Sequence, residues 1–428
     1  MKPEAKDKGR KPATSADIVW SSIEWDRRVG WRDHGADRYL YRPHQLLVGA
    51  RYEERLAPHL EEAGARRTRL RCTEGRLLES LGVRQWTLVG QNRNAPEAVD
   101  VLRERLDDLP PEEQAQAVTV NHVLGGAPVY RFGPGGLPSP GGPGAVQPER
   151  SKTRGTGKGV QVAILDTGFV KSSTAHALLA RDYADDGDDR DQLYDEGLAS
   201  FLSVVGGHGT FIAGIIRQRA PETVLDPEVT LDDVLLVDEV ELAQDLLRVR
   251  TAGIVNLSLA GPSEADRPPM ALARALEWLR QRSKGVYVAA AGNDYELAAE
   301  AKVPHQRMWP AAFGELRGFD HVVGVAAVDR EHRPAGFSNR GPWVRACAYG
   351  VEERSTFLTG TMPTPGGPLS FPHATARWSG TSFAAPRVVG AIAATMTAAG
   401  RSLSPRAALK ELLAGAPDGP PHFGKFVD

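Results

Sequence analysis

The sequence predicts an α/β fold in which helices cover both faces of a mostly parallel sheet, preceded by a small α+β domain. From residue 158 onward, helical segments alternate with continuous apolar runs such as VQVAILDTGF, GIVNLSLAG, GVYVAAAGN and HVVGVAAVD. Runs that are apolar on both faces are typical of buried parallel strands. Before residue 158 the strand and helix patterns are shorter, and a segment rich in Gly and Pro separates the two regions.

The N-terminal part contains an irregular segment and then a small domain. Residues 1–40 are polar and lack periodicity, whereas strand and helix patterns alternate through residues 41–130. Strands are predicted at 44–50, 67–73, 83–90 and 115–124, and helices at 52–64 and 95–109. This order, β-α-β-β-α-β, is that of the ferredoxin-like split unit.

Residues 131–157 include GPGGLPSPGGPGAVQPERSKTRGTG, in which Gly and Pro recur without a period. Such a composition is typical of an exposed linker. We therefore expect a domain boundary here, followed by the α/β domain over residues 158–428.

Composition and charge exclude several classes of partner. The chain of 428 residues is 41% hydrophobic and has a net charge of −2, which gives no electrostatic basis for binding nucleic acid or an anionic membrane. Cys72 and Cys347 are too few for a disulfide framework. The basic opening lacks the apolar core of a signal peptide, and no apolar stretch approaches the roughly 18 residues of a membrane span. A cytoplasmic protein is the default expectation.

Four polar residues lie where predicted strands end or helices begin. Asp166 follows the strand VQVAIL, His208 lies in GGHGTFIAG, Asn293 follows VYVAAAG, and Ser382 lies in SGTSFAAP before an apolar helix. Taken singly, each has an ordinary explanation as a turn, loop or helix-cap residue. Ligands bind at the carboxyl ends of the strands in such sheets, so the four together indicate a site.

These residue types are the set that nucleophilic acyl transfer requires. A serine hydroxyl becomes a good nucleophile when an imidazole takes its proton. A carboxylate fixes the tautomer of that imidazole, and an amide with a helix N-terminus can stabilise the oxyanion.

The segments AILDTG, HGTFIAG, VNLSLAG, AAAGN and SGTSFAAP resemble, in this order, the motifs of the subtilisin-like serine proteases, and the resemblance extends from about residue 158 to 400. It implies a catalytic triad of Asp166, His208 and Ser382, with Asn293 as the oxyanion donor. Ser382 is then expected both to cap its helix and to act as the nucleophile.

The resemblance also implies how substrate and N-terminal domain bind. The segment Ser258, Leu259, Ala260 and Gly261 is similar to the family strand that pairs with an extended substrate backbone. Many family members carry a ferredoxin-like propeptide whose tail covers the active site, and VTVNHVLGG at residues 118–126 is placed like that tail. We expect the N-terminal domain to be an inhibitor, with a module that recognises substrates or partners as the alternative.

Two departures from the family pattern stand out. Phe211 replaces a histidine that is common in the family but not catalytic, so activity is not affected. The acidic segment 181–197 could bind calcium, but it lacks the EF-hand spacing and is better interpreted as a solvated loop. No metal or cofactor is therefore expected, with calcium as the open alternative.

The sequence thus predicts a serine endopeptidase that acts on peptide or protein substrates through an acyl-enzyme. The alternative is a regulatory or binding protein built on an occluded protease scaffold.

Overall fold

The computed structural model describes residues 28–34, 37–59, 71–73, 77–89, 94–126, 136–149, 156–169, 177–180, 182–184, 194–195, 201–203, 206–300, 302–364, 367–400 and 402–428. The segment predicted to be irregular, residues 1–40, lies largely outside this set. So does most of the acidic segment 181–197.

The α/β region is built on a sheet with the strand order β11-β8-β13-β15-β16-β17-β22, and all of its strand pairs are parallel. Its strands are β8 (Gln161–Asp166), β11 (Val224–Val229), β13 (Ile254–Leu257), β15 (Val286–Ala290), β16 (Val322–Val328), β17 (Val344–Tyr349) and β22 (Lys425–Phe426). Every residue of β13, β15 and β16 is buried, as their continuous apolar composition predicts. The predicted mostly parallel sheet is confirmed.

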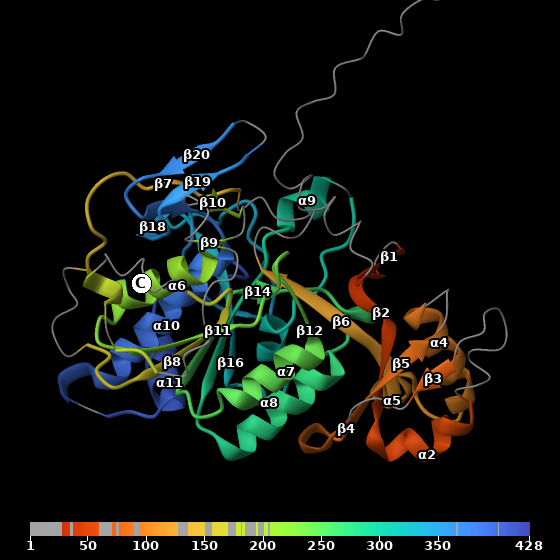
Figure 1. Ribbon diagram of the computed structural model, residues 1–428. Helices are drawn as coiled ribbons and strands as arrows, with labels where there is room; N and C mark the ends of the chain where they lie inside the picture. The colour runs from red at the N-terminus through yellow and green to blue at the C-terminus, as the bar shows by residue number, and fades with distance from the viewer. Residues whose placement is uncertain are drawn as a thin grey trace, which may run out of the picture.

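Helices cover both faces of this sheet (Figure 1). They are α6 (His208–Arg219), α7 (Glu239–Arg248), α8 (Met270–Arg282), α10 (Thr381–Thr397) and α11 (Pro405–Gly415). The short helix α9 (Tyr295–Glu300) follows β15 and lies apart from these layers (Figure 1). Val162 and Ile164 of β8 join the apolar cluster that contains α6 and α10, whereas Ala163 and Leu165 join the cluster that contains α7 and α8. The alternation along one strand therefore produces two cores.

The N-terminal region contains antiparallel strands in the order β6-β2-β5-β3, and β1 pairs with β2. Its elements are β1 (Gly30–His34), β2 (Asp37–Gly49), α2 (Glu53–Leu56), β3 (Arg71–Thr73), β4 (Leu77–Leu78), β5 (Val83–Val89), α4 (Ala95–Arg103), α5 (Pro111–Ala117) and β6 (Val118–Gly126). The helices cover one face, where Trp86, Val99 and Leu102 form a core. The domain limits at 41–130 and 158–428 stay a prediction.

Local signals explain where this region differs from expectation. The last strand, expected at 115–124, begins only at Val118 because α5 precedes it, with Pro111 at its first position and Glu112 and Glu113 in its first turn. The stretch 30–34, assigned to the irregular segment, is instead β1, since β2 offers it a pairing edge. The helix expected at 52–64 is described only to residue 59, as α2 between short 3₁₀ turns.

Two small sheets lie beside the main one. They comprise β7 (Ser139–Pro140), β18 (Glu353–Thr356) and β21 (Thr375–Trp378), and β9 (Tyr194–Asp195), β10 (Phe201–Leu202), β19 (Gly360–Met362) and β20 (Leu369–Phe371). Both are visible beside α6 in Figure 1.

The described part of the expected linker, residues 136–149, packs on the α/β region rather than standing exposed. Its strand β7 pairs with β21, and Val146 is buried. The guanidinium of Arg354 donates hydrogen bonds to four consecutive backbone carbonyls, those of residues 141–144, among them Gly141 at 2.9 Å and Gly144 at 2.5 Å. A Gly- and Pro-rich backbone forms few hydrogen bonds of its own, so its carbonyls remain available to a distant arginine.

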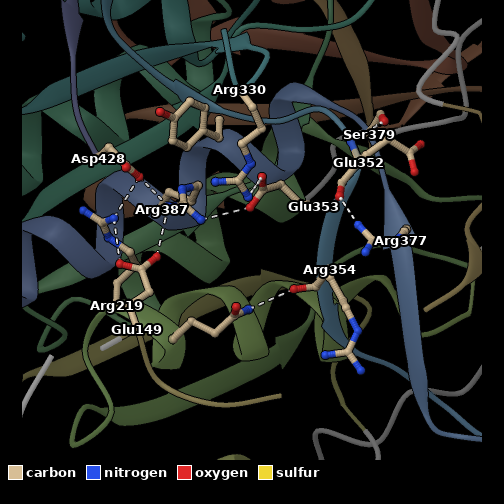
Figure 2. A network of polar contacts seen from close by, with 12 residues as sticks. Glu149, Arg219, Arg330, Glu352, Glu353, Arg354, Arg377, Ser379, Arg387 and Asp428 are labelled. Carbon is tan, nitrogen blue, oxygen red and sulfur yellow. Dashed lines mark hydrogen bonds and ion pairs between the residues drawn. The ribbon is translucent and has the colours of Figure 1, made fainter. Parts of the chain in front are cut away.

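This segment ends in a buried network of charges (Figure 2). Arg387 of α10 pairs with Glu149 at 3.0 Å, with Glu353 at 2.9 Å and with Asp428. Arg219 of α6 pairs with Glu149 at 3.0 Å and with Asp428 at 2.9 Å. Burial alone would raise the pKa of Asp428, but Arg387 and Arg219 outweigh it and hold that pKa below its usual value. The network therefore joins α6, α10, β18 and the segment 136–149.

We expect Arg387→Met to lower the free energy of unfolding by roughly 1.5–3 kcal/mol, because the buried Glu353 keeps only Arg330 as its cation, and Glu149 and Asp428 keep only Arg219. Because its folded-state pKa is depressed, Asp428 stabilises the protein above its unfolded pKa and loses that contribution as the pH falls through the folded value. The difference from wild type should therefore shrink in acid. Urea unfolding at pH 7 and at about pH 2.5, which is below the ordinary pKa of an aspartate, measures both effects.

Arg333→Met is the matched control, since Arg333 pairs with Asp329 on the surface at 2.7 Å. It should leave the urea midpoint nearly unchanged. Equal midpoints for the two variants would show that the buried network does not stabilise the fold.

Candidate active site

Asp166 and His208 form a buried pair at the carboxyl end of β8. His208 is the first residue of α6, and its Nδ1 lies 2.8 Å from Oδ1 and 3.0 Å from Oδ2 of Asp166. Both side chains are fully buried. The Asp166 Oδ1 atom also accepts the backbone N–H of Thr167 at 2.9 Å, which fixes the carboxylate toward the imidazole.

Glycine is required beside this pair. A Cβ on Gly209 would lie 2.1 Å from the carbonyl oxygen of Gly168, so the start of α6 can approach the loop after β8 only without a side chain there. The N–H of Gly209 donates to Oγ1 of Thr167 at 3.1 Å. This contact holds the two loops, and hence Asp166 and His208, in register.

Aromatic rings enclose the imidazole of His208. The ring of Trp378 packs edge-on, with its centroid 5.3 Å from that of the imidazole. The centroid of the Phe383 ring lies 5.4 Å from that of the imidazole. Phe211, the residue that departs from the family pattern, packs on both of these aromatic rings and so supports the enclosure around the imidazole. The Nε2 atom of His208 is buried and has no hydrogen-bond partner within the described residues.

Ser382 lies at the start of α10, next to the end of β13. Its Oγ donates to the carbonyl of Ser258 at 3.3 Å, and Oγ of Ser258 donates to the carbonyl of Ser382 at 2.7 Å. The N-cap position is Gly380, so Ser382 is the second residue of the helix and does not cap it as expected. Phe383, the next residue of α10, contacts the imidazole of His208, whereas no hydrogen bond between Ser382 and that imidazole is found in the described residues.

The side chain of Asn293 is oriented by the first residue of α10. Its Oδ1 accepts from the backbone N–H and from the hydroxyl of Thr381, both at 2.9 Å. The Thr381 hydroxyl accepts in turn from the N–H of Gly292 at 3.1 Å. With Oδ1 held, the amide nitrogen lies near Gly380, and no hydrogen bond of that nitrogen is found in the described part of the chain. A donor therefore lies beside the N-terminus of α10.

A second layer of polar contacts supports this loop. Asn339 donates from Nδ2 to the carbonyl of Ala291 at 3.0 Å and to Oδ1 of Asp294, and its N–H donates to the carbonyl of Gly292. Burial raises the pKa of Asp294 to about 6. Sequence reasoning did not identify Asp294, Asn339 or Thr381. Only Asp294 and Thr381 had a signal, because they adjoin predicted site residues.

The segment Ser258–Gly261 has three different partners. Leu259 and Ala260 form β14, which pairs antiparallel with β6, Leu259 opposite Gly126 and Ala260 opposite Gly125. Ser258 contacts Ser382 as described above. Gly261 instead exchanges two backbone hydrogen bonds with Trp309, at 3.0 and 2.8 Å. The predicted pairing strand is thus two residues long.

The opposite edge of β6 pairs with β12 (Leu236–Asp238). The N–H of Gly126 donates to the carbonyl of Leu235 at 2.9 Å. The strand β6 therefore lies between β12 and β14, as it crosses from the N-terminal region into the α/β region (Figure 1). We call the space between β12 and β14 the peptide groove.

The described residues contain neither a candidate metal site nor a candidate membrane span. Within the described residues, no group of His, Cys, Asp and Glu side chains has an arrangement that could hold a metal ion. In the same part of the chain, no helix is long and apolar enough to cross a bilayer.

The chain is similar to known proteases. It is 30% identical to mycosin-4 of Mycobacterium tuberculosis over 61% of this chain and 60% of that protein. It is 26% identical to an intracellular serine protease of Paenibacillus polymyxa over 55% of this chain and 66% of that protein. It thus spans less than two thirds of these relatives. A solved protease of Pseudoalteromonas arctica shares the fold, with a TM-score of 0.50 and 23% identity over 64% of this chain and 89% of that one.

The sequence pattern of the subtilase family matches residues 157–420. This range is more than half of the chain and contains all four predicted site residues. The chain therefore belongs to the subtilase family of subtilisin-like serine proteases.

Proposed function

We propose that the chain is a serine endopeptidase that hydrolyses peptide bonds through an acyl-enzyme, with Asp166, His208 and Ser382 as its triad. The observation that carries this proposal is the buried hydrogen bond between Asp166 and Nδ1 of His208, next to the helix start that bears Ser382. The acceptor Asp166 holds the proton on Nδ1, so Nε2 is left free to take the proton of a serine hydroxyl.

The reaction follows from these positions. Ser382 Oγ turns from the Ser258 carbonyl toward Nε2 of His208, loses its proton there and attacks the substrate carbonyl. The oxyanion accepts hydrogen bonds from Nδ2 of Asn293 and the N-terminus of α10. The imidazolium then donates its proton to the leaving amine, the C–N bond breaks, and water hydrolyses the ester by the same route.

We further propose that the N-terminal region inhibits this site in the intact chain. Its strand β6 fills the peptide groove between β12 and β14 with main-chain hydrogen bonds, as a substrate strand would. From Gly125 to Gly126 the strand advances along β14 from Ala260 to Leu259, and hence toward Ser258 and Ser382.

Opposite charges hold the region in place. Arg103 forms a bidentate pair with Glu264, both contacts at 2.7 Å, and Arg42 pairs with Asp238 at 2.9 Å. The Nδ1 atom of His122 lies 2.7 Å from the buried Glu239. Both arginines and His122 come from the N-terminal region and the carboxylates from the α/β region, so the contacts favour this docking over others.

The occupied groove also favours the second candidate function, a regulatory protein on an occluded scaffold. The two differ in whether Ser382 reacts. A fluorophosphonate probe, which labels an activated serine, separates them.

We expect Ser382→Ala to abolish both fluorophosphonate labelling and peptide hydrolysis while leaving thermal unfolding unchanged, because only the nucleophilic oxygen is lost. His208→Ala should cost a similar factor, since triad members act as a unit. Undiminished turnover of Ser382→Ala would refute the proposed mechanism. A chain that does not react with the probe even when the contact between Arg103 and Glu264 is broken would favour the regulatory protein.

Asn293→Ala is expected to lower kcat by roughly 10²–10³ with little change in KM, the loss measured when one such donor is removed from subtilisin. The oxyanion exists only in the transition state, so substrate binding should not weaken. Steady-state kinetics on a peptide substrate tests this. A raised KM with an unchanged kcat would make Asn293 a binding or turn residue.

Arg103→Glu in the full-length chain should raise peptide hydrolysis roughly tenfold or more, because two carboxylates then face each other in a partly buried contact. Glu264→Arg added to it should restore inhibition by reversing the pair.

The control for this pair is Arg55→Glu, which breaks the contact with Asp108 inside the N-terminal region and should leave the rate unchanged. If Arg103→Glu hydrolyses peptides no faster than wild type, the N-terminal region does not inhibit.

A further inference from the structure

The end of β6 defines one position in the peptide groove. Gly126 is paired with Leu259, one residue away from Ser258, whose carbonyl accepts the hydrogen bond of Ser382 Oγ. A peptide bound in the same register would therefore place the residue at the Gly126 position immediately before the residue that faces the nucleophile. We call this place in the groove the Gly126 subsite.

Two leucine side chains close the Gly126 subsite. A Cβ at position 126 would lie 3.0 Å from Cδ1 of Leu231 and 3.6 Å from both Cβ and Cδ1 of Leu235. The first distance is shorter than an ordinary van der Waals contact, so even a methyl group requires Leu231 to shift. Any atom beyond Cβ that points the same way would enter the space that the two leucines fill.

The wall formed by the two leucines is held rigidly. Leu231 and Leu235 are 3% and 0% exposed and belong to the main apolar core. The N–H of Leu231 donates to the backbone carbonyl of Asp166 at 3.0 Å. The Asp232 carboxylate accepts from the N–H groups of Val234 and Leu236 at 3.0 and 2.8 Å, which holds the turn around Leu235. The backbone that carries the two leucines is therefore fixed, and the packing of the core confines their side chains.

The groove accepts a larger side chain two positions earlier. Leu124 is paired with Val237 of β12, and its side chain is buried in the same apolar core as Leu231 and Leu235. The site thus accommodates a large apolar side chain at the Leu124 position and excludes one at the Gly126 subsite.

We propose that Leu231 and Leu235 restrict substrates to those with glycine at the Gly126 subsite, and that the substrate class is a peptide or protein with the pattern apolar-x-Gly before the residue that Ser382 attacks. Alanine is accepted there at a lower rate, and branched or longer side chains are excluded. This inference rests on the proposed endopeptidase function.

The wall can be tested without any catalysis. Hydrogen exchange of the β6 amides in the full-length chain should be slow in wild type and roughly tenfold or more faster in Gly126→Val, because overpacking expels the strand end. Adding Leu231→Ala should restore most of the protection. Gly415→Val is the control, since a Cβ at Gly415 meets no atom within 4 Å. Wild-type protection in Gly126→Val would overturn the proposal.

Specificity is tested with two fluorogenic peptides that differ only by Gly or Val at the Gly126 subsite. Full-length protein carrying Arg103→Glu, in which the proposed inhibition is relieved, should cleave the Gly peptide at least tenfold faster than the Val peptide in kcat/KM. Adding Leu231→Ala or the milder Leu231→Val should reduce this ratio. Leu242→Ala, which truncates an equally buried leucine of α7, should preserve it.

Equal cleavage of both peptides by the Arg103→Glu protein would refute the restriction while leaving the endopeptidase function intact. If neither peptide is cleaved and the fluorophosphonate probe does not label Ser382, the proposed function fails. The exchange measurement then still decides whether the leucine wall exists.

Discussion

Asp166 is the residue on which the arrangement of the site depends. Its carboxylate holds the imidazole of His208, while its backbone carbonyl accepts the N–H groups of Thr230 and Leu231, which begin the wall of the peptide groove. One buried position at the end of β8 thus fixes the orientation of the base and the shape of the place where a peptide would lie. A carboxylate can be buried here only because the imidazole and the N–H of Thr167 satisfy it.

The strand β6 gives the N-terminal region two roles in the architecture. It is a central strand for β2 on one side and fills the gap between β12 and β14 at its end, so one continuous strand joins two sheets. Main-chain pairing of this kind is independent of sequence, and specificity must therefore come from side chains such as Leu231 and from the charges around Arg103 and Glu264.

Features that depend on local sequence patterns were predicted, whereas contacts between residues far apart in the chain were not. The continuous apolar runs of β13, β15 and β16 were sufficient to predict a buried parallel sheet, because burial on both faces leaves no polar positions. The family motifs located Asp166, His208, Asn293 and Ser382. Three contacts were not predicted, because each joins residues far apart in the chain. They are the hydrogen bonds from Thr381 to Asn293, the packing of residues 136–149 and the pairing of Gly261 with Trp309. The Gly- and Pro-rich composition of 136–149 suggested an exposed linker instead. Its partners, Arg354 and β21, lie far away in the sequence and could not be recognised from the segment itself.

The network around Arg387 also affects how well the fold resists proteolysis. Endopeptidases cleave extended chain, so a segment becomes vulnerable when it detaches and is exposed, even briefly. Glu149 and Asp428 belong to segments at the periphery of the fold, and the network ties both to α6 and α10, the helices that start at His208 and Thr381. Detachment of either segment then leaves the buried Arg219 and Arg387 with fewer anions, which raises the free energy needed for local opening. The same ion pairs that close the fold therefore also keep both segments out of reach of a protease.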